Sequence, residues 1–263
     1  MSFRQNLINA RGHIVFLVAL LFGLGFVMSL ESLLSDPPEV TADAPSATGT
    51  QDIMASFEAI TPLPLAVQGS STAEDIEFAK IAWKYFQNNT DPVTGLVNSA
   101  NNYPSTTMWE TGSYFVAVVS AELLGIIPSD EAKDRISKVL TSLDGQRLFD
   151  DVLPNKAYNV KTVELVDYSN KPSEKGLGWS ALDIARFTAT LGIVEHHHPD
   201  LSPLVSRLLK HWDLSHMVKD GQLFGGNVID GKTREDQEGR VGYEQYAAKG
   251  MMLFGFDMYR SYH

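Results

Sequence analysis

The sequence predicts an all-α fold: an (α/α) toroid-like array of helical hairpins with a small β-hairpin excursion, preceded by one N-terminal transmembrane helix. Three observations predict it: a long uncharged apolar run near the start, a series of amphipathic segments with helical spacing, and a stretch that occurs three times in similar form. Each copy places an aromatic residue, Trp109, Trp179 or Tyr243, before a polar residue and an apolar helical pattern. Such repeats indicate repeated helix pairs, with aromatic and acidic side chains at the same end of three helices. The copies are residues 108–115, 178–185 and 242–249.

Residues 14–34 predict a transmembrane signal anchor. The run carries no charge before Glu31, and a helix that crosses the hydrocarbon layer needs about 20 apolar residues, with about 17 as the lower limit. Arg4 and Arg11 precede it, so residues 1–13 are expected in the cytoplasm and the rest of the chain in the periplasm or outside the cell. The location expected is therefore the bacterial inner (plasma) membrane, crossed once. A cleaved secretory signal, whose apolar core is usually about 7–15 residues, is the alternative.

Residues 35–71 are rich in proline and in small polar residues, which predicts a flexible linker. Residues 72–263 then form one exported domain. The chain has no cysteine, so neither disulfides nor thiolate ligands can stabilise that domain. Its net charge of −11 argues against nucleic acid as a partner, because no basic stripe is present to neutralise phosphates.

No cofactor or metal is expected from the motifs in the chain. The phosphate-binding, dinucleotide-binding, zinc-protease and serine-hydrolase signatures do not occur. Three consecutive histidines, His196, His197 and His198, are the one feature that suggests a metal. Neighbouring residues on a helix point about 100° apart, so these three side chains would not converge on one ion.

Six helices are expected, each with its own signal. Thr72 is followed by acids and begins the first, Gly125 ends the second, and Ser129 begins the third with Asp130 and Glu131 in its first turn. Apolar residues at helical spacing define the others. The long stretch between the third and fourth helices alternates like short strands at 157–160 and 163–168, and a glycine-rich loop precedes the sixth. The helices expected are residues 72–88, 107–124, 129–143, 180–197, 202–212 and 243–259.

The second, fourth and sixth helices differ from the third and fifth. Small residues such as Ala117, Ala185 and Gly250 recur along the former, which favours close helix contacts and an inner layer. Charged residues, such as Lys133 and Arg135, occur along the latter, which suits an outer layer. This alternation of inner and outer helices is typical of a toroid.

Two acids at helix starts are candidate catalytic groups. Glu110 and Glu244 each follow an aromatic residue, and glycosidases use two carboxyl groups about 5–5.5 Å or 6.5–9.5 Å apart. Asp151 and Asp236, in the long loops, are candidate partners for them. The alternative is that the two glutamates are first-turn acids that stabilise the helix dipole, worth about 0.3–1 kcal/mol.

Four aromatic residues are candidates for substrate binding: Trp109, Tyr114, Trp179 and Tyr243. Aromatic faces stack on sugar rings, and their polar edges tolerate a wet cleft. Packing in the core is the alternative for each of them. The remaining tryptophans in the domain, Trp83 and Trp212, lie outside the repeat and are expected in the core.

Four motifs in order resemble the bacterial domain family of unknown function DUF3131, which is itself similar to glucoamylase-like (α/α) toroid proteins. The motifs are residues 103–114, 153–158, 178–186 and 238–248. The resemblance implies a six-hairpin toroid and a polysaccharide-related role at the cell envelope. A complete toroid of six hairpins has twelve helices, whereas this sequence predicts six. Three interpretations stay open: a truncated product, an open half-toroid, or half of a dimer. An incomplete ring would expose apolar helix faces, so an oligomer is expected if the toroid is incomplete.

The function expected is that of a membrane-anchored envelope protein, with the N-terminal helix in the membrane and a polysaccharide as ligand. As an enzyme it would be a glycoside hydrolase with general acid and base carboxylates. The alternative is a non-catalytic glycan-binding or scaffold protein that uses the same aromatic face.

Overall fold

The computed structural model describes residues 69–262. The expected cytoplasmic tail, the anchor at residues 14–34 and nearly all of the linker lie outside these residues. Within the described part, no helix is long and apolar enough to cross a membrane.

The first, second and fourth helices begin where the sequence places their capping residues. Ser129, expected to cap the third helix, is instead its first residue and follows Pro128, which makes no side-chain cap hydrogen bond. Thr107 accepts a hydrogen bond from the Trp109 amide, and the Glu110 carboxylate accepts one from the Thr107 amide, so this pair forms a capping box. Thr72 and Asp75 do the same at the first helix. The α-helices are α4 Ala73–Asn89, α5 Met108–Leu123, α6 Ser129–Asp144, α7 Ala181–His197, α8 Ser202–His211, α9 Tyr243–Met252 and α10 Tyr259–Tyr262; two short 3₁₀ turns are η1 Pro199–Leu201 and η2 Leu214–Met217.

One helix boundary differs from expectation. The sixth helix, expected over 243–259, ends at Met252 as α9, and the chain turns before the short α10. Gly255 lies in that turn with a φ of 87°, a left-handed conformation that a helix cannot contain. Apolar residues continue through the turn, so helical spacing alone did not reveal the break.

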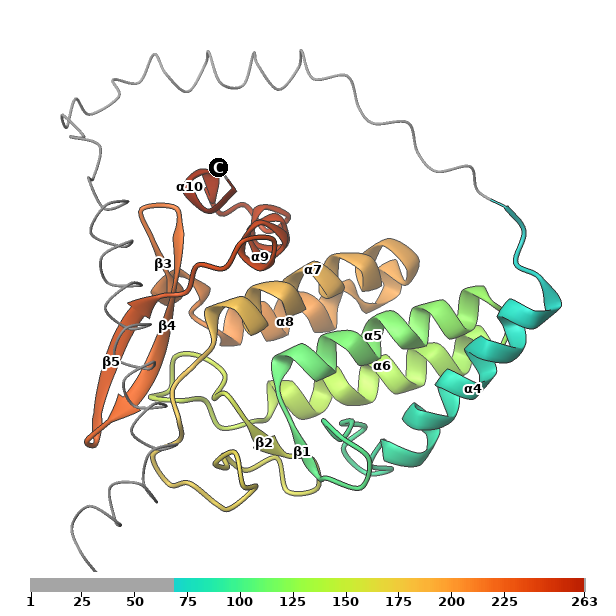
Figure 1. The fold of residues 1–263 in the computed structure, drawn as a ribbon, viewed down its shortest axis with the longest axis horizontal. Helices are drawn as coiled ribbons and strands as arrows, with labels where there is room; N and C mark the ends of the chain where they lie inside the picture. Colours follow the sequence, from blue (N-terminus) through green and yellow to red (C-terminus); the bar gives the residue numbers. More distant parts are fainter. Residues whose placement is uncertain (1–68, 263) are drawn as a thin grey trace, which may run out of the picture. The chain divides into compact units, whose positions relative to one another are not determined.

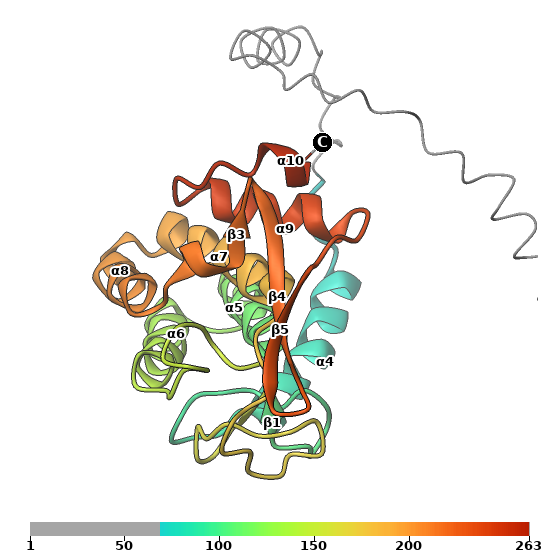
Figure 2. The ribbon, with the colours of Figure 1, turned by 90° about the vertical axis from the view of Figure 1, so that its left-hand side faces the viewer.

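The helices pack in two layers, as their composition predicts. α5, α7 and α9 pack side by side, while α6 and α8 pack against each other beneath them, and α4 lies against α5 (Figures 1 and 2). Small residues make the inner contacts possible. A Cβ added to Gly250 of α9 would lie 2.3 Å from the Ala185 carbonyl oxygen of α7, so only glycine fits there. Between α5 and α7, a Cβ on Gly112 would lie 3.3 Å from Thr190.

Aromatic rings fill the space between the layers. Phe187 of α7 packs against Phe115 of α5 and against Trp212, with ring centroids 5.4 and 5.7 Å apart. Trp83 is buried as well, so the prediction that Trp83 and Trp212 are core residues is confirmed. This packed centre joins the middle of α5 and α7 to the residue that follows α8.

The predicted helical fold with a small β-excursion is confirmed in its helices, but the structure also contains a sheet that was not expected. A three-stranded antiparallel sheet, in the order β3-β4-β5, occupies the region expected to be a glycine-rich loop. Asp220-Gly221 and Asp230-Gly231 form its two turns, and all four residues have positive φ, as two-residue hairpin turns require. The sequence does contain this signal. The strands are β3 Val218–Lys219, β4 Gln222–Ile229 and β5 Lys232–Gln237.

The hairpin expected within residues 157–168 is present only in reduced form. β2, Tyr158–Asn159, pairs mainly with β1, Ser105–Thr106, and meets its expected partner strand at a single bridge to Leu165. The stretch between α6 and α7 therefore pairs with the segment just before α5, which lies about 50 residues earlier in the sequence.

Candidate functional site

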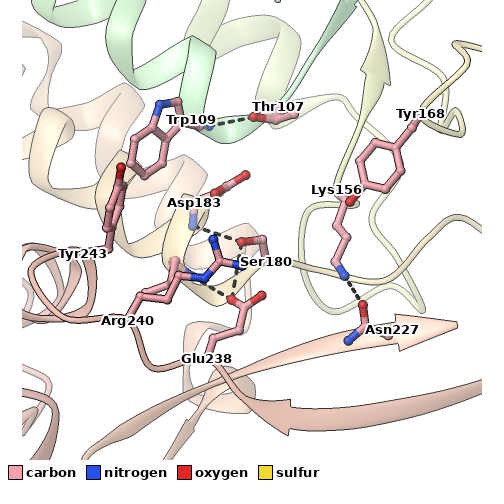
Figure 3. A pocket seen from close by; sticks show the side chains of 11 residues that line it. Thr107, Trp109, Lys156, Tyr168, Ser180, Asp183, Asn227, Glu238, Arg240 and Tyr243 are labelled. Carbon is pink, nitrogen blue, oxygen red and sulfur yellow. Dashed lines mark hydrogen bonds between the residues drawn. The ribbon is translucent and has the colours of Figure 1, made fainter. Parts of the chain in front are cut away.

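A pocket of about 550 Å³ opens where the N-terminal ends of α5, α7 and α9 meet the β4–β5 hairpin (Figure 3). The three similar stretches of sequence thus do bring three helix ends to one place. The pocket is lined by Thr107, Trp109, Lys156, Tyr168, Ser180, Leu182, Asp183, Asn227, Glu238, Arg240 and Tyr243.

The three aromatic residues of the repeat are not equivalent in the structure. Trp109 is the second residue of α5 and Tyr243 is the first residue of α9, whereas Trp179 precedes the N-cap of α7, Ser180. Because successive helical positions point about 100° apart, this difference sends the rings in different directions. The residues that are equivalent are the third ones of α5 and α7, Glu110 and Asp183.

An aromatic pair forms one wall of the pocket. Trp109 is partly exposed and Tyr243 is 54% exposed, and their ring centroids lie 5.4 Å apart. The guanidinium of Arg186 lies over the Trp109 ring. This wall offers a rigid apolar surface at the edge of a polar pocket, an arrangement suited to a flat, partly polar ligand.

Asp183 is an acid of the pocket whose pKa is raised. Burial raises the pKa of its carboxyl to about 6, and the nearby charge of Glu110 adds to this effect, while hydrogen bonding to Ser180 and Thr107 opposes it. A carboxyl of this kind holds a proton close to neutral pH, which is the requirement for a general acid.

Glu238, directly after β5, connects the β4–β5 hairpin to the start of α7 by hydrogen bonds. Its Oε2 accepts a hydrogen bond of 3.0 Å from the Leu182 amide and one of 3.4 Å from the Ser180 hydroxyl. The negative charge therefore lies at the N-terminal end of a helix, where the dipole stabilises it. The two acids of this side of the pocket, Asp183 and Glu238, thus come from elements far apart in the sequence.

The other wall of the pocket is polar. Figure 3 shows Lys156, Tyr168 and Asn227 on the side opposite the aromatic pair. The Lys156 ammonium donates a hydrogen bond to Asn227 Oδ1 of β4, and the Lys156 amide donates to the Gly178 carbonyl at 2.9 Å. Two loops and a strand are thereby joined at this wall.

The four acids predicted from the sequence lie outside the lining of this pocket. Glu110 accepts a hydrogen bond from the Thr107 amide in the capping box of α5, and its negative charge contributes to the raised pKa of Asp183. Glu244 accepts hydrogen bonds from Gln237 and Ser261. Asp236 pairs with Arg234 along β5, and exposed Asp151 lines a second pocket, of about 560 Å³, together with Asp150. The structure does not bring these four together.

Two of the four predicted aromatic residues are buried, so their placement on the binding face needs correction. Tyr114 is fully buried and packs on Phe86, with its hydroxyl accepting a hydrogen bond from Arg135. Trp179 is 2% exposed, lies against Gly226 and donates its indole N–H to the Phe224 carbonyl. The other two, Trp109 and Tyr243, do line the pocket.

Sequence reasoning missed much of the polar lining. Asp183 had a usable signal, since it stands three residues after the N-cap Ser180, as Glu110 stands three after Thr107. The only sequence feature that pointed to Lys156 was that it lies in the family motif 153–158. Asn227 lies in β4, and nothing in the sequence pointed to it without the β4–β5 hairpin. Ser180 and Arg240 lie in the family motifs 178–186 and 238–248, but the resemblance assigns no role to either residue.

No group of three or more His, Asp or Glu side chains that could hold a metal ion occurs within residues 69–262. His198 is buried, and its Nε2 lies 2.8 Å from Glu122 Oε2. The contact is an ion pair by distance, although its angles are not those of a hydrogen bond. This histidine therefore faces the helix packing and not a ligand.

A protein-family model described as "Protein of unknown function (DUF3131)" matches residues 77–263. A β-1,2-glucanase from Parabacteroides distasonis shares the fold with a TM-score of 0.55 at 15% identity, covering 74% of this chain and 30% of that one. An endo-β-1,2-glucanase from Chitinophaga pinensis (TM-score 0.44, 15% identity, 59% and 40% coverage) and a glucoamylase-like protein from Bacteroides uniformis (0.46, 12%, 62% and 42%) are also similar. The chain spans less than half the length of each of these structures. No curated protein matches it.

Proposed function

The chain belongs to the DUF3131 family, and on that premise we propose that its domain binds a polysaccharide in the pocket at the inner helix ends and cleaves it with Asp183 as general acid. One observation carries the proposal: a partly exposed aromatic pair, Trp109 and Tyr243, lies in the same pocket as a carboxyl whose pKa is raised to about 6. Aromatic rings bind the faces of sugars, and glycosidic bond cleavage needs a carboxylic acid that is still protonated near neutral pH.

The chemistry required of Asp183 is proton donation to the leaving oxygen as the glycosidic bond breaks. A water molecule supplies the hydroxyl group that the anomeric carbon gains, and its remaining proton replaces the one that Asp183 gave up. An ordinary aspartic acid, with a pKa near 3.9, would be ionised at the pH of most cell envelopes and could not donate. Burial of Asp183 supplies the shift, and the negative charge of Glu110 on the neighbouring helix increases it. The fold shared with a β-1,2-glucanase supports a glucan as the first substrate to test.

A second candidate function, glycan binding without cleavage, has its own supporting observation. Both carboxylates near Asp183 are engaged at helix N-termini: Glu110 with Thr107, and Glu238 with Leu182 and Ser180. A two-carboxylate mechanism needs a partner that is free to act as base or nucleophile. If these hydrogen bonds persist with ligand bound, the domain would bind and not turn over.

A single series of assays separates the two functions. The full chain is incubated with β-1,2-glucan, starch, other glucans and acidic polysaccharides, and both binding and release of reducing ends are measured. Cleavage that is lost in Asp183→Asn, with binding retained, supports the enzyme; Asp236→Asn, outside the pocket, serves as the matched control and should keep full activity. Binding without release by the parent protein identifies the binding module. Absence of both, across the glucans and acidic polysaccharides, contradicts the proposal.

The envelope location is a separate proposal that depends on residues 14–34. Their composition supports an anchor that presents the domain to an extracytoplasmic polysaccharide. Membrane fractionation of cells that express the full chain, compared with a chain lacking residues 1–34, tests it. Recovery of the full chain in the soluble fraction would contradict the anchor and leave the pocket's proposed function untouched.

A further inference from the structure

The polar wall of the pocket consists largely of hydrogen-bond donors. An ammonium group can only donate, so the bond from Lys156 fixes the side-chain amide of Asn227 with Oδ1 toward the lysine. The Nδ2 group of Asn227 is then turned away from the lysine, and within residues 69–262 it has no hydrogen-bond partner. Lys156 retains two further N–H groups after the bond to Asn227. This corner of the pocket therefore offers several donors.

The positive charge of Lys156 lacks a close counter-ion. Its side chain is partly buried, and no carboxylate of the described residues lies within ion-pair distance of Nζ. Burial lowers the pKa of Lys156, while the more distant charges of Glu238 and Asp183 oppose the shift. A cation that has lost part of its hydration without gaining an ion pair is unfavourable. An anionic group bound there would remove that cost.

A second cation lines the same pocket. Arg240 is exposed, and its guanidinium has no side-chain or backbone partner among residues 69–262. The net charge of −11 disfavours anions at long range, but at physiological ionic strength such fields are screened over about 8 Å. Contacts inside the pocket are therefore decided by the nearest groups. At this wall these are the Lys156 ammonium and the Asn227 amide, while the Glu238 and Asp183 charges act on Lys156 from farther away.

We propose that Lys156 and Asn227 bind the carboxylate of a uronic acid unit, so that acidic polysaccharides are the substrate class of the pocket. The inference rests on the proposed glycan function. A carboxylate has two oxygens with about four acceptor positions, and it matches the free donors of the lysine and the amide better than a single hydroxyl does. Hydrogen bonds of this charged type are also about twice as strong as neutral ones. The aromatic pair on the opposite wall would hold the face of the sugar.

The test compares each acidic oligosaccharide with its own methyl ester, which removes the charge and keeps the backbone. Oligogalacturonate and oligoglucuronate are titrated into the full chain by calorimetry, alongside neutral glucans. We expect the free acid to bind about tenfold more tightly than the ester. In Lys156→Met this preference should fall to about twofold or less, whereas Lys161→Met, an exposed lysine outside the pocket, should keep it.

A second variant keeps the test interpretable if Lys156→Met does not fold. Asn227→Asp puts a carboxylate beside the lysine and should abolish the preference for the acid, with thermal unfolding used to confirm that the variant is folded. Equal binding of acid and ester by the parent, or a preference that survives in Lys156→Met, overturns the inference while glycan binding stands. Failure of acidic and neutral oligosaccharides alike to bind overturns the proposed function and the inference with it.

Discussion

The guanidinium of Arg186 lies 3.9 Å from the centre of the Trp109 ring, and the same side chain donates a 2.6 Å hydrogen bond to the Trp109 carbonyl. A further bond, of 3.1 Å, goes to the Ser113 hydroxyl. Arg186 belongs to α7, while Trp109 and Ser113 belong to α5. Arg186 of α7 thus contacts both the ring and the backbone of Trp109 on α5. These contacts orient Trp109 in the aromatic wall of the pocket.

Arg186→Met should weaken glycan binding through Trp109. The variant keeps the length of the side chain but removes the cation–π contact and two hydrogen bonds, each contact being worth about 0.5–2 kcal/mol. We expect binding to weaken about three- to tenfold, measured by calorimetry. Arg207→Met, on α8, removes an ion pair with Asp144 and should leave binding unchanged. Unaltered affinity in Arg186→Met would show that Trp109 needs no support from α7.

Tyr243→Ala and Tyr246→Ala form a matched pair on α9. Both tyrosines are about half exposed, but only Tyr243 lines the pocket and touches Trp109. Loss of an aromatic contact of about 0.5–1.5 kcal/mol should weaken glycan binding about three- to tenfold in Tyr243→Ala. Tyr246→Ala should bind as the parent does. Equal effects of the two substitutions in a binding titration would place the ligand elsewhere on the surface.

The raised pKa of Asp183 makes stability depend on pH. In the folded state the carboxyl has a pKa of about 6, above the ordinary 3.8, so the folded protein binds this proton more tightly than the unfolded chain. The cost of burying the charge is absent below about pH 4 and is fully present above about pH 6. Asp183→Asn should therefore gain stability relative to the parent as pH rises through this range, by an amount on the order of 1–3 kcal/mol.

Urea unfolding of parent and variant at pH 4.5 and pH 7 measures this difference. A difference that is the same at both pH values would contradict the shifted pKa. If Asp183 is the general acid, the parent's release of reducing ends should also decline as pH rises through about 6, because the proton is lost.

Gly250→Ala tests the contact between α7 and α9. In an ordinary helix interior this change stabilises by about 0.5–1 kcal/mol, but here the new Cβ would lie 2.3 Å from the Ala185 carbonyl oxygen. We expect destabilisation of about 1–3 kcal/mol in thermal or urea unfolding. Gly145→Ala, where the nearest atom to the new Cβ is 3.8 Å away, should be tolerated. A stabilised Gly250→Ala variant would mean that the inner helices can separate.

Helix starts could be predicted because each depends on a few neighbouring residues. Thr107 and Glu110 satisfy each other's backbone and side-chain groups within a single turn, and this capping box was readable in the sequence. Small residues such as Ala185 and Gly250 likewise indicated which helices lie inside. The turns at Asp220-Gly221 and Asp230-Gly231 were equally local, and the β-hairpin was missed although its signal was present.

The roles of the site residues could not be predicted in the same way. Trp109 and Trp179 stand before similar helices, yet one is at the pocket and the other is buried against Gly226 of β4. The burial of Trp179 depends on β4, which lies more than 40 residues later in the sequence. Likewise, Lys156 acquires its position through a bond to Asn227, which is also on that strand.

By itself the sequence determined the family, the helix starts, the close-packing glycines and the meeting of three helix ends at one site. These features depend on hydrogen bonds within one turn or on the size of a single residue. The tertiary structure alone decided that Asp183 lies in the pocket with a raised pKa, and that Glu110 and Glu244 lie outside the pocket lining. A pKa is set by burial and by neighbouring charges, and for Asp183 the main neighbouring charge, Glu110, comes from another helix, brought close only when the inner layer packs.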